Sequence, residues 1–222
     1  MEKADEELAY AVKMRDYGKV ADAVKKGANL NSVDQQRRIP LHFACISGDL
    51  AIIKFLVENY SYLNVMDHKG NTPLIYLIQK GDVDSVKFLL ENGADPNVLG
   101  EEGLNALHIA TRKGDLQISR FLLQNGVDPN IRDKKGSTCL HYAVESADFA
   151  MASLLLQNGA NMEVKDDMGE TSLAAASRSG NLDFVRFVMD GRYVNANLAL
   201  MEACRWNHPR TVELILVAVR QL

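Results

Sequence analysis

Three histidines are the side chains best suited to catalysis or metal binding in this chain of 222 residues. His42, His108 and His141 each directly follow a leucine within a recurring pattern. An imidazole can bind a metal or move a proton near neutral pH, but shared coordination requires the rings to converge. Equivalent atoms in stacked helical repeats lie about 10 Å apart, the spacing of packed helices. The pattern therefore argues against one ion shared between neighbouring repeats.

No other residue pattern indicates an enzyme or a metal centre. The cysteines Cys45, Cys139 and Cys204 are far apart and form no C-x-x-C pair, so neither a zinc site nor a disulfide framework is expected. We expect Cys45 and Cys204 to be buried small side chains, because each follows a core alanine. No nucleophile elbow, phosphate-binding loop or H-E-x-x-H sequence occurs. The sequence predicts a non-enzymatic protein that uses no cofactor.

A six-residue signature recurs every 33 residues and explains the spacing of the histidines. Its five copies begin at residues 39, 72, 105, 138 and 171 and read IPLHFA, TPLIYL, NALHIA, TCLHYA and TSLAAA. The same period continues beyond the signature, because Gly48, Gly81, Gly114 and Gly180 each follow the signature leucine by seven residues. A fixed period of this length indicates a repeat architecture.

Each repeat reads as a pair of short helices followed by a turn. Thr72-Pro73 is a typical helix start, because proline at the first helical position has no amide to leave unpaired. An Asp or Asn after the next glycine can begin a second helix with apolar residues at helical spacing. A glycine such as Gly93 is then expected to end that helix in the left-handed conformation. Segments such as Asp67 to Gly70 place Asp first and Gly fourth, which predicts a type I turn.

This pattern resembles the ankyrin repeat family over residues 6–219. The resemblance implies an all-α fold, namely an α-solenoid with short β-hairpin fingers between helix pairs. It also implies that His42, His108 and His141 form structural hydrogen bonds. The period divides residues 1–222, taken as a single domain, into seven units: an N-terminal cap at about 6–38, repeats at 39–71, 72–104, 105–137 and 138–170, a unit with a shortened finger at 171–197, and a C-terminal cap at 198–222.

Several positions depart from the repeat pattern. Arg15, Arg37 and Ala147 stand where other units carry a turn or helix-end glycine. The last two units are six residues closer together than the period, so we expect a finger to be missing between Gly191 and Asn197. Irregular terminal units are typical of the caps of a repeat array.

Composition and charge narrow the class of partner. The formal net charge is −4, whereas general nucleic-acid binding requires a basic surface. The acidic N-terminus lacks the basic and apolar segments of a secretory signal, and the apolar stretch at 214–219 is too short to span a bilayer. We therefore expect a protein of the cytoplasm, and also of the nucleus, with another protein as its partner and no membrane.

Side chains that the fold does not need can form a binding surface. In each first helix, the residues two, five and six after the signature leucine lie on another face than the core residues. Aromatic and basic residues gather there, and both types are enriched at binding hot spots. The predicted partner-binding residues are Tyr76, Lys80, Ile109, Arg112, Lys113, Tyr142, Arg178, Arg205 and Trp206. In the alternative, the aromatic members only pack against neighbouring helices.

These residues predict an interaction scaffold or adaptor that binds an acidic or aromatic-bearing protein segment through its concave face and hairpin tips. A second function class stays open, because aromatic stacking beside Lys and Arg also suits a small anionic ligand or an oligonucleotide in the same groove. The resemblance further implies that a hairpin asparagine can be hydroxylated. Asn97 and Asn130 occupy matching positions, although proline precedes each in place of the usual aliphatic residue.

The last helix, at residues 212–219, is apolar on nearly all sides. Val217 falls where an earlier repeat carries Glu58, yet a terminal repeat normally needs a polar outer face. We predict that a continuation of the chain, a second copy or a partner covers this face. In the alternative, Leu216, Val217 and Val219 fold back onto Trp206 and nothing else binds there.

Overall fold

The computed structural model describes residues 3–100, 102–178, 181–190, 196–205 and 207–219, which form fourteen helices. The all-α fold class with finger-like connections is confirmed. Within these ranges the only β pairing is an isolated bridge between Lys165 and Thr171 at the base of one finger. The chain forms two compact units, residues 1–110 and 111–222.

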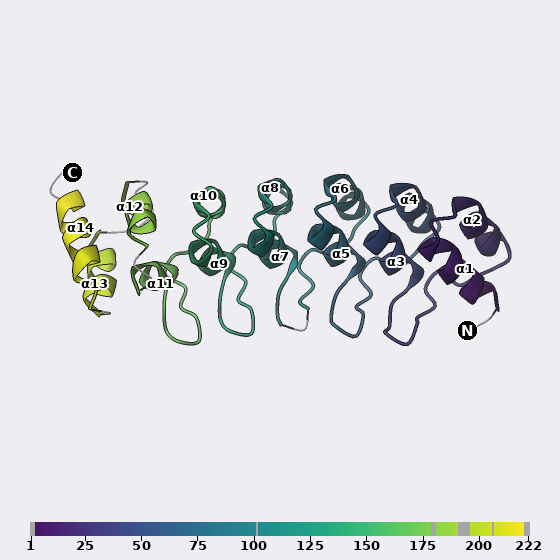
Figure 1. Ribbon diagram of the computed structural model, residues 1–222, viewed down its shortest axis with the longest axis horizontal. Helices are drawn as coiled ribbons and strands as arrows, with labels where there is room; N and C mark the ends of the chain where they lie inside the picture. The colour runs from purple at the N-terminus through teal and green to yellow at the C-terminus, as the bar shows by residue number, and fades with distance from the viewer. Residues whose placement is uncertain (1–2, 101, 179–180, 191–195, 206, 220–222) are drawn as a thin grey trace. The chain divides into compact units, whose positions relative to one another are not determined.

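Within each unit the helices form two layers, and the fingers extend from the layer of first helices (Figure 1). The first helices are α1 (Lys3–Lys13), α3 (Pro40–Ser47), α5 (Pro73–Lys80), α7 (Ala106–Lys113), α9 (Cys139–Glu145), α11 (Ser172–Arg178) and α13 (Ala196–Arg205). The second helices are α2 (Tyr17–Lys25), α4 (Leu50–Glu58), α6 (Val83–Glu91), α8 (Leu116–Gln124), α10 (Phe149–Gln157), α12 (Leu182–Asp190) and α14 (Pro209–Val219).

The signature leucines are buried at equivalent positions, as predicted: Leu41, Leu74, Leu107, Leu140 and Leu173. Cys45 is also buried, and that burial raises the pKa of its thiol. The prediction for Cys204 is wrong, because its side chain is exposed. The residue lies on α13, and in the described residues no later helix pair follows to cover it.

Helix starts follow two rules. The second helices α4, α6, α8 and α10 begin after an aspartate whose side chain accepts a hydrogen bond from the amide three residues on, as between Asp49 and Ile52 at 3.1 Å. Thr72 is the residue before α5 with Pro73 at the first position, as predicted, but its side chain forms no capping bond. The first helices therefore use another acceptor where a histidine is present.

That acceptor is the signature histidine, whose predicted structural role is confirmed. The Nδ1 of His42 accepts from the amide of Ile39 at 3.1 Å, and its Nε2 donates to the carbonyl of Asn71 in the next finger at 3.2 Å. His141 repeats the arrangement with the amide of Thr138 and the carbonyl of Glu170, at 3.1 and 3.3 Å. The rings of His42 and His141 thus join the start of a first helix to the following finger, and in the third signature the Nδ1 of His108 accepts from the amide of Asn105 at 3.3 Å.

Left-handed backbone occurs where glycine was replaced. Arg15, Arg37 and Ala147 have φ values of 57, 61 and 54°, matching the positions at which the sequence departs from the glycine pattern. Tyr60, with φ of 68°, occupies the position of Gly93 one repeat earlier. A side chain in this conformation costs about 1–2 kcal/mol. The predicted missing finger between Gly191 and Asn197 falls largely outside the described residues; α12 ends at Asp190 and α13 begins at Ala196.

The free energy of unfolding is expected to fall as the pH is lowered from 7.5 to 5.5. Burial disfavours the charged imidazolium and lowers the pKa values of His42 and His141. An unfolded histidine protonates near a pKa of about 6.5, so the unfolded state binds more protons in this range and gains stability. Urea unfolding across this pH range measures the effect. His42→Gln should flatten the dependence, whereas His68→Gln on an exposed finger should retain it; identical slopes would contradict the assignment.

Ala147→Gly is expected to raise the free energy of unfolding by about 1 kcal/mol, because glycine adopts the left-handed conformation without a Cβ clash. The matched change is Gly114→Ala, at the equivalent position one repeat earlier. A Cβ on Gly114 would meet only Asp148 Oδ2, at 3.6 Å, so that substitution probes conformation and is expected to be destabilising. Urea unfolding of both variants provides the measurement. A less stable Ala147→Gly variant would show that this backbone carries no strain.

Candidate functional site

The two predicted partner-binding tyrosines hold the fingers in place. The hydroxyl of Tyr76 donates to Asp67 Oδ2 at 2.5 Å, and the hydroxyl of Tyr142 donates to Asp133 Oδ2. Both tyrosines are half-buried, and both aspartates are buried. In each case the aspartate precedes the tyrosine by nine residues. That spacing is visible in the sequence and is the signal that identifies the pair.

The same aspartates also stabilise the finger backbone. Asp67 Oδ1 accepts from the amides of Lys69 and Asn71 at 2.8 and 2.9 Å. Burial acts to raise the pKa of Asp67, but the Tyr76 hydroxyl and these amides lower it overall. Burial and the neighbouring carboxylate raise the pKa of Tyr76. The pair is therefore a neutral hydroxyl donating to a carboxylate at neutral pH.

In other fingers the equivalent carboxylate has a different partner, or the aspartate is absent. In the first finger, Asp34 pairs with Arg38 at 2.8 Å, and the Arg38 guanidinium lies 4.5 Å from the centre of the Phe43 ring. Phe43 occupies the position of Tyr76 and has no hydroxyl. Where Gly100 replaces the aspartate, the corresponding first-helix residue is Ile109, which is half-buried. A tyrosine thus accompanies an aspartate in two fingers, and the finger without a carboxylate has no tyrosine.

Lys80 is exposed but contacts the preceding repeat. Its Nζ donates to the carbonyl of Ser47 at the end of α3, and Arg15 Nη2 donates to the same carbonyl. The last carbonyls of a helix carry partial negative charge and favour nearby cations. Lys80 therefore helps to stabilise the C-terminal end of α3.

The remaining predicted residues belong to the C-terminal unit. Arg112 and Lys113 are exposed at the end of α7, and the Arg112 guanidinium lies 5.5 Å from the centre of the Tyr142 ring. Arg178 Nε donates to Glu170, a buried carboxylate, at 2.9 Å. Arg205 is exposed, and Trp206 lies outside the described residues. The structure thus brings Arg112 and Tyr142 together, while Arg178 compensates the buried charge of Glu170.

A series of exposed apolar side chains lies on the fingers of the N-terminal unit. Val33, Met66 and Leu99 occupy the same position in three consecutive fingers and are 52, 41 and 48% exposed. In the C-terminal unit this position carries Arg132 and Lys165. We call Val33, Met66 and Leu99 the finger stripe. It was not among the predicted residues, although the 33-residue period aligns its members.

The two asparagines of the predicted modification differ in environment. Asn97 is exposed. Asn130 is half-buried; its Nδ2 donates to the carbonyl of Gly159 at 2.9 Å, and its Oδ1 accepts from the amide of Asn161 at 2.7 Å. The Asn130 amide therefore links consecutive repeats. Hydroxylation at either residue stays a prediction.

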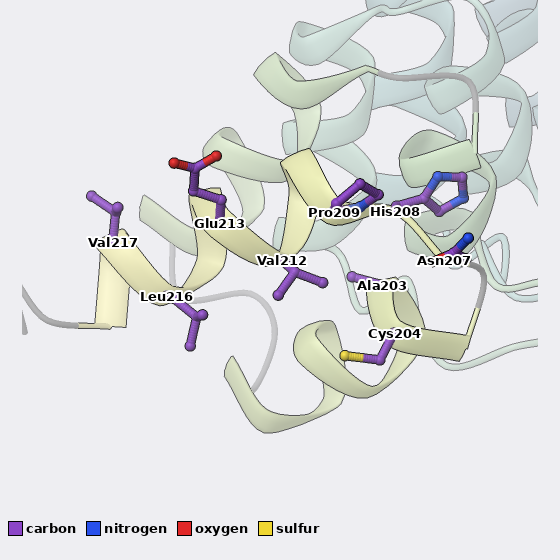
Figure 2. A pocket seen from close by; sticks show the side chains of 9 residues that line it. All are labelled: Ala203, Cys204, Asn207, His208, Pro209, Val212, Glu213, Leu216 and Val217. Carbon is purple, nitrogen blue, oxygen red and sulfur yellow. The ribbon is translucent and has the colours of Figure 1, made fainter.

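A cavity of about 550 Å³ lies between α13 and α14 and is lined by Cys204, Val212 and Leu216 among others (Figure 2). Leu216 and Val217 are exposed, as expected from the sequence, but Arg210 and Glu213 are exposed on the same helix, so the outer face of α14 is apolar only near its C-terminal end. What covers this face stays a prediction. The alternative contact with Trp206 involves a residue outside the described part. None of the described helices has the length and apolar character needed to cross a membrane.

Tyr142→Phe is expected to lower the free energy of unfolding by about 1.5–3 kcal/mol, the usual contribution of a hydrogen bond to a charged group. The change removes only the hydroxyl and leaves the ring beneath Arg112. Tyr62→Phe, at an exposed side chain, is the control and should be neutral. Urea unfolding of the two variants measures the difference. Equal stability would mean that the Asp133 contact does not support the finger.

Comparison with known proteins agrees with this geometry. A family model of ankyrin repeats, three copies long, matches residues 8–100, 95–166 and 154–220. The crystal structure of the ankyrin repeat domain of Bcl-3, described as a unique member of the IkappaB protein family, is similar with a TM-score of 0.83 and 27% identity over 94% of this chain and 97% of that chain. No curated protein sequence matches significantly. With the family model matching most of its length, the chain belongs to the ankyrin repeat family.

Proposed function

We propose that this chain is a non-enzymatic interaction scaffold that binds an extended segment of a partner protein along the finger stripe. Ankyrin repeats generally bind other proteins, and the similar Bcl-3 domain is itself an ankyrin repeat domain. The single observation that carries the proposal is the repeated exposure of Val33, Met66 and Leu99.

The stripe differs from ordinary exposed apolar residues in its regularity. Single apolar side chains on a surface are common and need no explanation. Three at the same position of consecutive repeats form a row, and covering apolar surface contributes about 25 cal/mol per Å². The fold does not require these side chains to be apolar, because Arg132 and Lys165 occupy the same position in the C-terminal unit.

The geometry of the stripe favours an extended segment. Neighbouring repeats are about 10 Å apart, and a polyproline II segment rises about 3.1 Å per residue with three residues per turn. Every third side chain of such a segment points to the same side, about 9 Å from the last, so apolar residues at every third position would meet successive fingers. Arg37 and Lys69 are exposed at the tips of the first two fingers, whereas the third carries Glu102. This supports acidic residues in the part of the segment that faces the first two fingers.

The structure gives less support to base stacking in the groove. The rings of Tyr76 and Tyr142 are half-buried, and their hydroxyls bind the finger aspartates. A stacking platform for an oligonucleotide needs freely accessible aromatic faces beside cations. The protein segment is accordingly the function that we propose.

Peptides selected from a random displayed library against the whole chain are expected to carry apolar residues three positions apart. The triple variant Val33→Lys, Met66→Lys, Leu99→Lys should bind these peptides at least roughly tenfold more weakly, because it removes the apolar contacts at all three fingers. Its urea midpoint should stay close to that of the unchanged chain, since the C-terminal unit already accepts cations at this position. Fluorescence anisotropy measures the affinities.

A matched control separates the stripe from the added charge. Glu58→Lys and Glu91→Lys together add more positive charge than the triple variant, but on exposed sites of α4 and α6. This double variant should bind the peptides normally. The proposal fails if the triple variant binds as tightly as the control, or if the selected peptides show no periodic apolar residues.

A further inference from the structure

The loop that follows α4 departs from the repeat pattern at consecutive residues, beginning with Tyr60. Tyr60 has a left-handed backbone, with φ of 68°. Glycine adopts this conformation at no steric cost, whereas a residue with a Cβ is destabilised by it. Four other repeats place a left-handed glycine at this position: Gly27, Gly93, Gly126 and Gly159. The folded chain is therefore less stable with Tyr60 than it would be with glycine.

The next two residues also lower stability. At the position of Tyr62, four other repeats carry a side chain whose oxygen accepts from the amide two residues on, at 2.8–2.9 Å: Asn29, Asp95, Asp128 and Asn161. A tyrosine side chain cannot form this short turn contact, which is particular to Asn and Asp. Ser61 is buried where other repeats carry Ala28, Ala94 and Val127, and its hydroxyl has no hydrogen-bond partner among the described residues. A buried hydroxyl without a partner is unfavourable.

Burial does not compensate for these losses, because the two tyrosines are exposed. Tyr60 is 88% exposed and Tyr62 is 64% exposed. Backbone strain that persists without a structural gain is typical of functional positions, and tyrosine is enriched among the residues that contribute most to binding. We call Tyr60 and Tyr62 the loop tyrosines. Their exposure at a cost in stability indicates a contact surface.

Acidic side chains lie beside the loop tyrosines. Glu58 is at the end of α4, just before the loop, and Glu91 and Asp95 occupy the positions of Glu58 and Tyr62 in the next repeat. All three carboxylates are exposed. In the preceding repeat, the position of Glu58 carries Lys25. The acidic groups therefore belong to the repeat of the loop tyrosines and to the one after it.

Tyr62 and Asp95 hold the same place in neighbouring repeats. The amide of Tyr62 donates to Asn31 Oδ1 at 2.7 Å, and the amide of Asp95 donates to Asn64 Oδ1 at 2.9 Å. The two backbones are thus one repeat apart, or about 10 Å. Asp95 Oδ1 accepts from the amide of Asn97, but a carboxylate can accept several hydrogen bonds. One cationic side chain between them can therefore reach both the ring and the carboxylate.

We infer that the loop tyrosines bind an arginine-bearing segment of a partner protein. A guanidinium group is planar, so it can stack on an aromatic ring while it pairs with a carboxylate. The chain itself contains this combination: the Arg38 guanidinium lies 4.5 Å from the centre of the Phe43 ring and pairs with Asp34 at 2.8 Å. The inference rests on the loop alone, so it holds whether or not the finger stripe binds a segment.

Titration of the ¹⁵N-labelled whole chain with a glycine-serine peptide that carries two arginines tests this surface. Saturable shifts are expected for the amide signals of residues 58–62 and 91–95. Matched peptides with lysine or citrulline in place of arginine should bind at least roughly threefold more weakly, because lysine lacks the plane and citrulline lacks the charge. Shifts confined to other residues, or equal binding of the lysine peptide, overturn the inference.

The double variant Tyr60→Gly, Tyr62→Asn restores the pattern of the other repeats. Its urea midpoint should rise, because glycine relieves the backbone and asparagine can form the turn hydrogen bond. Its affinity for the arginine peptide should fall at least roughly tenfold, because both rings are lost. A folding defect would lower the urea midpoint, so a higher midpoint with weaker binding identifies the loop tyrosines as the contact surface. Unchanged binding overturns the inference.

Asp95→Asn tests the carboxylate separately. Asn29 and Asn161 form the same turn hydrogen bond, so this change removes only the charge. It should weaken binding of the arginine peptide roughly threefold, the effect of losing one exposed ion pair. Asp128→Asn, at the equivalent position one repeat later, is the matched control and should bind as the unchanged chain does. Equal losses in the two variants would show general attraction to an acidic protein and overturn the surface.

Discussion

A pair of helices of eight or nine residues cannot be stable alone in water, and this constraint shapes the rest of the molecule. Isolated helices shorter than about 12–15 residues are marginal even with favourable sequences. Each pair must therefore bury its apolar face against the next, and the signature leucines are buried at equivalent positions for this reason. The same requirement places many polar side chains where one repeat contacts the next. Polar side chains that make no such contact between repeats are available for binding a partner.

Three recurring polar contacts supply hydrogen-bond partners for backbone groups within and between the repeats. Aspartates cap the second helices, histidines such as His42 connect a helix start to the next finger, and finger aspartates such as Asp67 bind both their own turn and a tyrosine. A buried polar atom without a partner costs about 1–3 kcal/mol. The contacts are consequently repeated wherever the local residues allow them.

The features set by local geometry could be predicted from the sequence. Helix starts, left-handed positions such as Ala147 and the structural histidines depend on residues a few positions apart, which the 33-residue period makes visible. The role of Tyr142 was missed, because an aromatic residue on that face suits either a binding surface or a contact with the finger; the nine-residue spacing from Asp133 is the signal that distinguishes the two. Cys204 was mispredicted because burial at its position depends on a following helix pair. The exposure of Met66 likewise follows from three-dimensional packing, since an apolar residue in a turn can also point inward.

The finger stripe and the starts of the second helices are opposite kinds of position. One finger position carries Val33, Met66, Leu99, Arg132 or Lys165 in successive repeats, so the fold leaves this position free to carry specificity. The start of a second helix is not free in the same way, because a suitable capping side chain contributes about 1 kcal/mol. Asp49, Asp82, Asp115 and Asp148 supply that cap in four consecutive repeats. A change at the finger position can therefore alter what binds without removing a contact that holds a helix in place.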